Sequence, residues 1–274
     1  MTASVLHLAN HCERGGNVHL AVDLACEQAA RGQRVTFASA GGRYTALLER
    51  CGVRHVLLEQ NLRRRWGAAR AAGRTIALCR DCRPDVIHAH MMSGAVLGAV
   101  AGRLLGVPLV TTVHNSFDRH AWLMRLGDAI VAVSRSDREL LLARGFPARR
   151  LVVVVNGTLA SYSEPFGLGI LEAREAGCAV LGSRVGGIAE QLGPDRFGLT
   201  FPPGRPDLIA VELRRLMTDA PALEAAKSVA REGLAEYHVG RMADDYAAVY
   251  AGVTGGARVA APAVPADLPQ SLRL

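Results

Sequence analysis

The first half of the chain alternates short apolar, β-branched runs with helix-length segments, and this alternation limits the possible folds more than any other feature. The runs lie near residues 5–9, 35–37, 56–58, 85–88, 109–113, 129–133 and 152–155. Strands and helices in this order form a parallel sheet covered by helices on both faces. We therefore predict an α/β fold in which residues 1–156 form one complete, doubly wound domain.

The second half has fewer strands. Its pattern predicts a helix over 167–176, strands over 178–181 and 198–201, and helices near 207–217, 223–238 and 242–253. A chain of 274 residues is short for two full doubly wound domains. We expect an abbreviated second α/β domain over 157–253, either with its own small sheet or sharing the strand at 152–155. Prolines recur among alanines over 254–274, which predicts a disordered tail.

A serine starts the helix that follows the strand at 129–133. Ser134 precedes Asp137 by three residues, and Ser136 precedes Glu139 by the same spacing. Either serine can cap the helix, because a hydroxyl accepts a hydrogen bond from the N–H three residues on. Gly145 is expected to end it.

The segment from Ser93 to His114 is nearly uncharged and about long enough to cross a bilayer. Gly106 and Pro108 divide it into a small-residue helix and a β-branched run. We therefore predict a buried helix followed by a buried strand, and no membrane span.

The formal net charge of +7 comes from arginine, since Lys227 is the only lysine. The arginines are scattered, and the densest run, at 63–65, accompanies no nucleic-acid motif. We expect no nucleic-acid partner.

Six irregularly spaced cysteines and a polar start after Met1 predict a cytoplasmic protein with reduced thiols. Cys79 and Cys82 form a C-x-x-C with His88 and His90 nearby, which allows a zinc or redox interpretation. There is no second C-x-x-C, and the two histidines belong to a strand, so we expect no metal site.

Three loops have the composition of ligand-binding turns. Glu13-Arg14-Gly15-Gly16 lies between a strand and a helix, where glycines and free N–H groups can bind an anion, although a plain tight turn is as consistent. Gly186-Gly187 repeats the pattern before Glu190. His114 directly follows a central strand, where ligands of open α/β sheets bind.

The run from Ser163 to Glu172 contains two carboxylates, Glu164 and Glu172, eight residues apart around the start of a helix. Pro165 suits the first helical turn, and Gly167 leaves backbone N–H groups open. This pattern suits a ligand with both hydroxyls and phosphate. A capped helix with exposed acids is an equally good interpretation from spacing alone.

Together these stretches resemble the retaining nucleotide-sugar glycosyltransferases of the GT-B fold, in particular family 4 (glycosyl transferases group 1). The resemblance spans residues 4–252 and rests on these segments: 13–16, 85–90, 112–115, 133–136, 155–157, 163–172 and 185–190. It implies two Rossmann-like domains facing each other across a cleft, one complete and one abbreviated. It also implies sugar transfer from a nucleoside-diphosphate sugar, with retention at the anomeric carbon.

The resemblance also assigns residues. It implies that Glu164 contacts the transferred sugar near the reaction centre, that His114 lines the sugar pocket, and that Glu172 binds the ribose hydroxyls. The donor-binding positions are Gly15, Gly16, Phe166, Gly167 and Leu168. No metal or other cofactor is implied, because positive helix ends can stabilise the leaving diphosphate.

The chain departs from the family after Asn156-Gly157, because it reaches Glu164 within a few residues and lacks the segment whose arginine and lysine neutralise the diphosphate. We predict an internal deletion in the C-terminal domain and impaired activity, since each lost contact is worth about 1.5–3 kcal/mol. A non-catalytic remnant that acts as a binding or partner subunit is the alternative. A sugar, a lipid and a small molecule stay open as acceptors. Peripheral association with the inner face of the membrane and oligomerisation also stay open.

Overall fold

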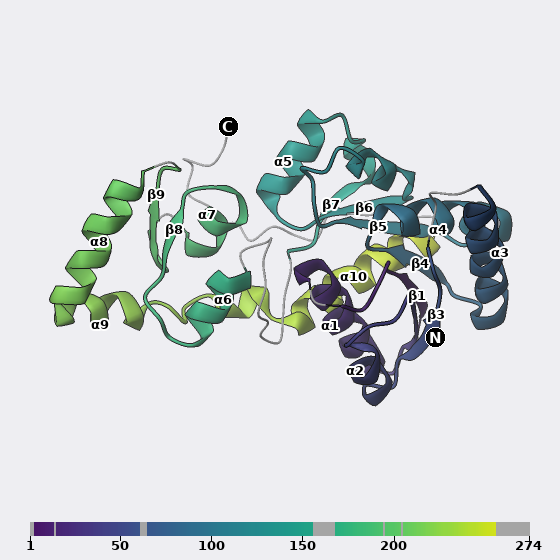
Figure 1. The fold of residues 1–274 in the computed structure, drawn as a ribbon, viewed down its shortest axis with the longest axis horizontal. Coiled ribbons are helices and arrows are strands. Elements are labelled where there is room, and N and C mark those ends of the chain that lie inside the picture. Colours follow the sequence, from purple (N-terminus) through teal and green to yellow (C-terminus); the bar gives the residue numbers. More distant parts are fainter. Residues whose placement is uncertain are drawn as a thin grey trace.

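A seven-stranded, wholly parallel sheet forms the larger part of the computed structural model, which describes residues 3–13, 15–60, 65–155, 168–193, 195–203 and 205–255. The strand order is β3-β2-β1-β4-β5-β6-β7 (Figure 1). The strands are β1 (Ser4–Leu8), β2 (Arg34–Ser39), β3 (Arg54–Leu57), β4 (Val86–Ala89), β5 (Leu109–Val113), β6 (Ala129–Ala132) and β7 (Leu151–Val153). Each of the seven predicted runs overlaps one of these strands.

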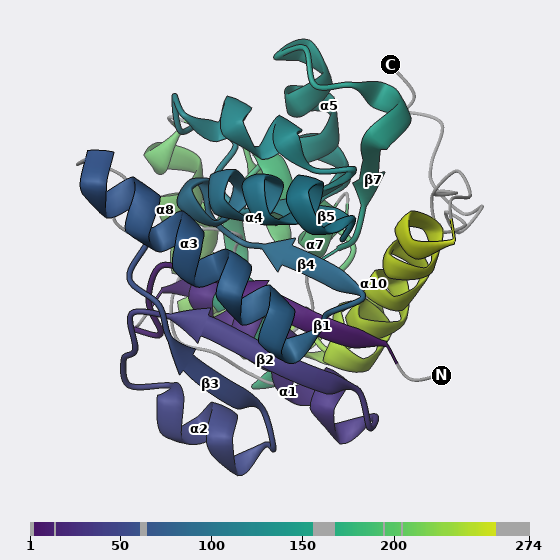
Figure 2. The same cartoon turned by 90° about the vertical axis from the view of Figure 1, so that its right-hand side faces the viewer.

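Helices cover both faces of this sheet, as the predicted α/β fold requires (Figure 2). The helices of this part are α1 (Gly16–Ala30), α2 (Thr45–Arg50), α3 (Arg65–Cys82), α4 (Met92–Leu105) and α5 (Arg135–Ala143), with 3-10 turns at Ala121–Leu126 and Ala148–Arg150. Alternate strand residues point to opposite faces. Leu6 and Leu8 of β1 pack in the cluster with α3 and α4, whereas Val5 packs on the other face.

Helix α4 confirms the predicted buried helix before β5. Its small residues allow a close approach to the sheet, since a Cβ added to Gly98 would lie 2.8 Å from Leu109 Cδ1. Among the described residues, no helix is long and apolar enough to cross a membrane. Ser134, rather than Ser136, caps α5, because its Oγ accepts from Asp137 N at 3.0 Å.

The second part has a two-stranded parallel sheet, β8 (Leu181–Ser183) and β9 (Leu199–Phe201), within the described residues. Its helices are α6 (Leu168–Glu175), α7 (Gly186–Leu192), α8 (Pro206–Thr218) and α9 (Ala220–Ser228), with a 3-10 turn at Leu234–Tyr237 and α10 (Val239–Thr254). Strand β7 pairs with β6 and is not shared between the sheets.

Two predicted elements of this part are wrong in their bounds. The strand expected over 178–181 begins only at Leu181, because Gly177 at φ +74° and the bond from Cys178 N to Ala173 O continue the exit turn of α6. The helix expected over 223–238 ends at Ser228. Gly233 then takes a left-handed conformation at φ +69°, which starts a separate 3-10 turn.

Arg174 is fully buried at the centre of the second part. Its guanidinium donates to the carbonyls of Ala230 (2.9 Å), Gln191 (2.5 Å) and Glu232, and it stacks on Phe197. These bonds join α6, the end of α7 and the loop after α9. They compensate for the desolvation of the charge, which otherwise costs several kcal/mol.

Helix α10 leaves the second part and packs on the first sheet (Figures 1 and 2). Its buried residues Val239, Met242, Tyr246 and Val249 share one cluster with residues of β1, β4, β5, β6 and β7. The C-terminal end of the described chain therefore completes the core of the N-terminal sheet. The boundary at 156/157 lies outside the described residues. Of the tail predicted over 254–274, Thr254 is instead the last residue of α10, and residues 256–274 lie outside the described residues.

Candidate active site

The strand order changes direction between β1 and β4. From β1 the chain continues to β2 on one side, whereas from β4 it continues to β5 on the other side. Loops at the carboxyl ends of two such strands diverge and leave a crevice, which is where open α/β sheets bind ligands. The loop before α1 follows β1, the segment at His90 follows β4, and His114 follows β5. All three lie at the carboxyl edge of the sheet.

Helix α1 begins at Gly16 with Gly15 as its N-cap, which confirms the predicted helix start. No side chain caps this end from Gly15, and its first turn contains no acidic residue. Val18 N in this turn donates to Asn17 Oδ1 at 2.9 Å. The N–H groups of Gly16 and Asn17, with the positive end of the helix dipole, are the ones that can act on an anion. Arg14 lies outside the described residues.

The loop before α1 rests on the loop after β2, a contact that the motif analysis missed. Cys12 N donates to Gly41 O at 2.8 Å, and Tyr44 N donates to Cys12 O at 3.0 Å. Gly42 lies at φ +144°, and a Cβ there would lie 2.5 Å from the carbonyl carbon of Cys12. Only glycine allows this approach, so the spacing of glycines at 41 and 42 was the available signal.

His114 directly follows β5 and is half-buried, as expected for a residue that lines a pocket. Burial lowers its pKa to about 4, so the ring is neutral near pH 7. Its Nε2 lies 3.3 Å from Nδ1 of His90.

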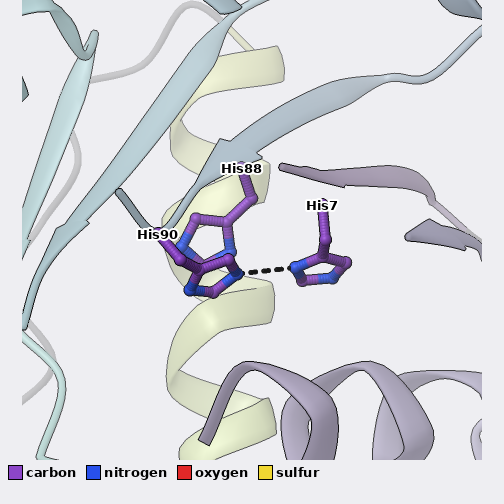
Figure 3. A group of neighbouring side chains, drawn as sticks. All are labelled: His7, His88 and His90. Atoms are coloured by element: carbon purple, nitrogen blue, oxygen red, sulfur yellow. Dashed lines mark hydrogen bonds between the residues drawn. The ribbon is translucent and has the colours of Figure 1, made fainter. Parts of the chain in front are cut away.

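His114 is the outermost of four histidines. His7 of β1 and His88 of β4 are register partners in the sheet, and His90 follows β4 (Figure 3). His7 Nδ1 lies 2.9 Å from His90 Nε2, and the rings of His88 and His90 are 4.1 Å apart between centroids. From the sequence, His88 and His90 were expected only as residues of a strand, with no contact to His7. The available signal was that two apolar strands, at residues 5–9 and 85–88, each carry a histidine on one face, His7 and His88.

Side chains from both covering helices complete this polar core. His7 Nε2 contacts Gln28 Oε1 of α1 at 2.7 Å, and His88 Nδ1 contacts the Tyr250 hydroxyl of α10 at 2.6 Å. Burial lowers the pKa of His7 to about 4 and keeps the pKa values of His88 and His90 well below 6.5. All four rings are therefore uncharged near neutral pH.

Glu172 lies on α6, and this helix packs against α1. Leu171 and Leu20 form the buried contact between the two helices. His19 of α1 has a raised pKa, mainly through its hydrogen bond to Asp23 and in small part through the charge of Glu172. Glu172 Oε1 is buried and has no hydrogen-bond partner among the residues that the structure describes.

The remaining predicted donor-binding residues precede α6. Leu168 is the first residue of that helix. Glu164, Phe166 and Gly167 lie outside the described residues, so their roles stay predictions.

Gly186 and Gly187 are the first two residues of α7, and Glu190 of this helix contacts the first part of the chain. Its carboxylate accepts from Ser136 N at 2.7 Å and from Arg135 N at 3.2 Å. Glu190 thus binds the N-terminus of α5, where a carboxylate is favourable. Arg184 directly follows β8 and donates to Thr200 Oγ1 of β9 at 3.0 Å.

His7, His88 and His90 each offer a nitrogen within 4.8 Å of the others, and they are the one such group of possible metal ligands in the described residues. Cys79 and Cys82 lie at the end of α3 outside this group. Burial raises the pKa of Cys79 to about 12, which makes a reactive thiolate unfavourable.

A surface pocket lies at the opposite edge of the sheet, beside Asp85, Arg103 and Asp128. Both aspartates already serve the sheet, since they accept from Ser4 N at 2.7 Å and from Leu109 N at 2.8 Å. The carboxyl edge therefore remains the candidate site.

Comparison with protein families gives two matches. The model described as Glycosyltransferase Family 4 matches residues 14–158, and the model described as Glycosyl transferases group 1 matches residues 152–233. No curated protein sequence matches significantly.

Solved structures of similar fold include the following three. HepE from Anabaena, in complex with UDP and glucose, is 15% identical with a TM-score of 0.76. The match covers 89% of this chain and 98% of the HepE chain. A glycosyltransferase from Rickettsia africae is 12% identical with a TM-score of 0.77, covering 92% and 98%. Sucrose-phosphate synthase from Thermosynechococcus elongatus is 14% identical with a TM-score of 0.73, covering 93% and 100%.

Proposed function

The chain belongs to glycosyltransferase family 4, and from this premise we propose that it moves a sugar from a nucleoside-diphosphate sugar to an acceptor with retention at the anomeric carbon. The HepE structure contains UDP and glucose, and we extend this donor class to the present chain as part of the proposal. A sugar, a lipid or a small molecule is the acceptor.

The observation that carries the proposal is the position of Glu172 opposite α1. This carboxylate comes from the second part of the chain, has a buried oxygen without a partner among the described residues, and acts on His19 near the glycine-led start of α1. A carboxylate oxygen accepts hydroxyl donors, and a free helix N-terminus binds phosphate. A nucleoside diphosphate offers a ribose to the carboxylate and a diphosphate to the helix N-terminus.

We propose the following roles, of which those of Glu164, Phe166 and Gly167 rest on the sequence motif alone. Glu172 binds the ribose hydroxyls, and the N–H groups after Gly15 and Gly16 act on the diphosphate. His114 lines the sugar pocket. Glu164 contacts the transferred sugar, and the N–H groups of Phe166, Gly167 and Leu168 contact the sugar or phosphate. Helix ends stabilise the leaving diphosphate electrostatically, with no metal in this scheme.

One observation favours the alternative of a non-catalytic binding subunit. The second sheet has two strands in the described part of the chain, against seven in the first. This agrees with the proposed internal deletion, which removes the cationic pair expected at the diphosphate. A protein of this kind would keep the fold and some nucleotide affinity but lose turnover.

Calorimetry with UDP and with UDP-glucose tests binding first. We expect Glu172→Gln to weaken UDP binding about 10- to 100-fold, since a hydrogen bond to a charged group contributes about 1.5–3 kcal/mol. Glu175→Gln is the matched control, because Glu175 lies on the same helix and is exposed.

Turnover is then measured as release of the nucleoside diphosphate with candidate acceptors, in the parent and in Glu164→Ala and His114→Ala. Release that both substitutions reduce supports the transferase. Binding without release from any donor supports the non-catalytic subunit. Absence of affinity for every nucleoside diphosphate contradicts the proposed donor site.

A further inference from the structure

The buried histidines form one continuous hydrogen-bonded chain that runs from the cleft to α10. Its members in order are His114, His90, His7, Gln28, Tyr250, His88, Thr112 and Tyr246. Consecutive polar atoms lie between 2.6 and 3.3 Å apart. The chain connects β1, β4 and β5 with α1 on one side and α10 on the other.

The amide of Gln28 sets the direction of the protons in the first part of this chain. Its Oε1 faces His7 Nε2 at 2.7 Å, and an amide oxygen only accepts, so His7 carries its proton on Nε2. A neutral ring has one proton, hence His7 Nδ1 accepts from His90 Nε2. Because the neutral His90 ring carries its one proton on Nε2, its Nδ1 accepts a hydrogen bond from His114 Nε2.

The Nε2 atom of the Gln28 amide sets the direction of the protons in the second part of the chain, from Tyr250 to Tyr246. Gln28 Nε2 donates to the Tyr250 hydroxyl at 3.3 Å, so this hydroxyl directs its own proton to His88 Nδ1. His88 then carries its proton on Nε2 and donates it to Thr112 Oγ1 at 2.7 Å. Thr112 continues the chain to Tyr246 at 2.8 Å.

We propose that His7, His88, His90 and His114 share one ring tautomer, protonated on Nε2, and that this coupling holds His114 with Nδ1 as a hydrogen-bond acceptor. Rotation of the Gln28 amide by half a turn would reverse every bond and protonate all four rings on Nδ1. The network therefore has two self-consistent states, and Gln28 selects between them. Burial supports the neutral rings that both states need.

The consequence for the cleft rests on the proposed function. A half-buried His114 with an unprotonated Nδ1 accepts a hydrogen bond from a sugar hydroxyl, whereas the reversed state would offer it a donor. In this scheme His90, His7 and Gln28 are positioning residues, because they act on substrate through His114. Tyr250 lies beyond Gln28 and sets only the state of His88.

A metal ion at His7, His88 and His90 is the competing use of the same atoms. It would need lone pairs on His7 Nδ1 and His90 Nε2 together, yet these two nitrogens share one proton at 2.9 Å. Freeing His90 Nε2 moves the proton to Nδ1 and breaks the bond from His114. Metal binding and the shared tautomer therefore exclude each other.

Nitrogen NMR of the full chain, labelled with ¹⁵N at the histidine rings, tests the proposal without reference to activity. Couplings between ring protons and ring nitrogens show which nitrogen is protonated. His7→Gln, His88→Gln, His90→Gln and His114→Gln each remove one ring and so assign the signals. We expect all four rings to be neutral and protonated on Nε2 at pH 7.5.

Four rings protonated on Nδ1, or a mixture of tautomers, would overturn the proposal. So would metal analysis that finds stoichiometric zinc which resists chelation. Loss of donor turnover in the parent chain would contradict the proposed function but would leave the tautomer result intact, so the two failures are distinguishable.

Two phenylalanine variants test the coupling. His90→Phe removes the acceptor of His114, so we expect the His114 ring to populate both tautomers and UDP-glucose affinity to fall several-fold. Tyr250→Phe interrupts the chain on the other side of Gln28, so the His88 signals are expected to change and the His114 signals to stay. Unchanged His114 signals in His90→Phe would overturn the coupling, and the parent spectrum remains decisive if this variant does not fold.

Discussion

Acidification is expected to destabilise the fold through its buried histidines. His7 is fully buried, and burial lowers its pKa from 6.5 to about 4, against an opposing effect of the hydrogen bond to Gln28. The folded chain therefore binds fewer protons than the unfolded chain between these two values, so stability falls as the pH falls. The loss begins near pH 6.5 and is complete below the folded pKa.

The magnitude follows from the two pKa values of His7. One unit of pKa difference corresponds to about 1.4 kcal/mol, so the loss from His7 reaches about 2 kcal/mol at pH 5. His88, His90 and His114 add to it, because their pKa values are lowered in the same direction. His19 opposes it, since the hydrogen bond to Asp23 raises its pKa. A domain has only about 5–15 kcal/mol of net stability, so the effect is large.

Urea unfolding followed by circular dichroism at pH 7.5 and pH 5 measures this loss. We expect the parent to lose well over about 2 kcal/mol, and His7→Gln to lose about 2 kcal/mol less than the parent over the same range. His120→Gln is the control, because His120 lies on an exposed loop and should keep the parent's loss. Equal stability of the parent at the two pH values would refute the reasoning.

Three further substitutions test separate contacts. Gly42→Ala should weaken UDP binding at least about 10-fold by displacing the loop before α1, because the new Cβ would lie 2.5 Å from the Cys12 carbonyl carbon. Calorimetry measures this loss. Gly32→Ala is the control for a positive φ alone, since nothing lies within 4 Å of a Cβ at that position. Arg174→Met should lower stability by about 3–5 kcal/mol in urea unfolding, since it leaves two buried carbonyls and one part-buried carbonyl without their donor. An unchanged midpoint would contradict this role. Glu190→Gln should lower stability by about 0.5–1 kcal/mol, because it removes a charge from the N-terminus of α5, and its effect should shrink in high salt, which urea unfolding at two salt concentrations measures.

The first sheet could be predicted almost completely, because buried parallel strands appear in the sequence as continuous apolar runs between helix-length segments. All strands of β1–β7 follow from such local patterns, whereas the choice of Ser134 over Ser136 as the cap of α5 came from the structure. The second part was less predictable, since Arg174 holds it together through backbone carbonyls and leaves no periodic signal.

The positions of Gly15, Gly16 and His114 were predictable, because each follows directly from its own strand and loop, and their roles in binding stay predictions. The polar core was not, because Gln28 and Tyr250 are separated by 222 residues and meet only in the folded chain. A lone polar residue on an apolar helix face does not indicate which distant residue it will contact in the folded chain. Such long-range contacts need the structure.

The packing of α10 on the first sheet affects the order in which the chain can fold during synthesis. The face of β1, β4, β5, β6 and β7 that carries Val5, Val86 and Val131 is covered by a helix that ends at Thr254. A ribosome that has made only the seven strands thus holds a nascent sheet with one apolar face unprotected, a state that favours aggregation and chaperone binding. Completion of this core must wait until residues 239–254 have emerged.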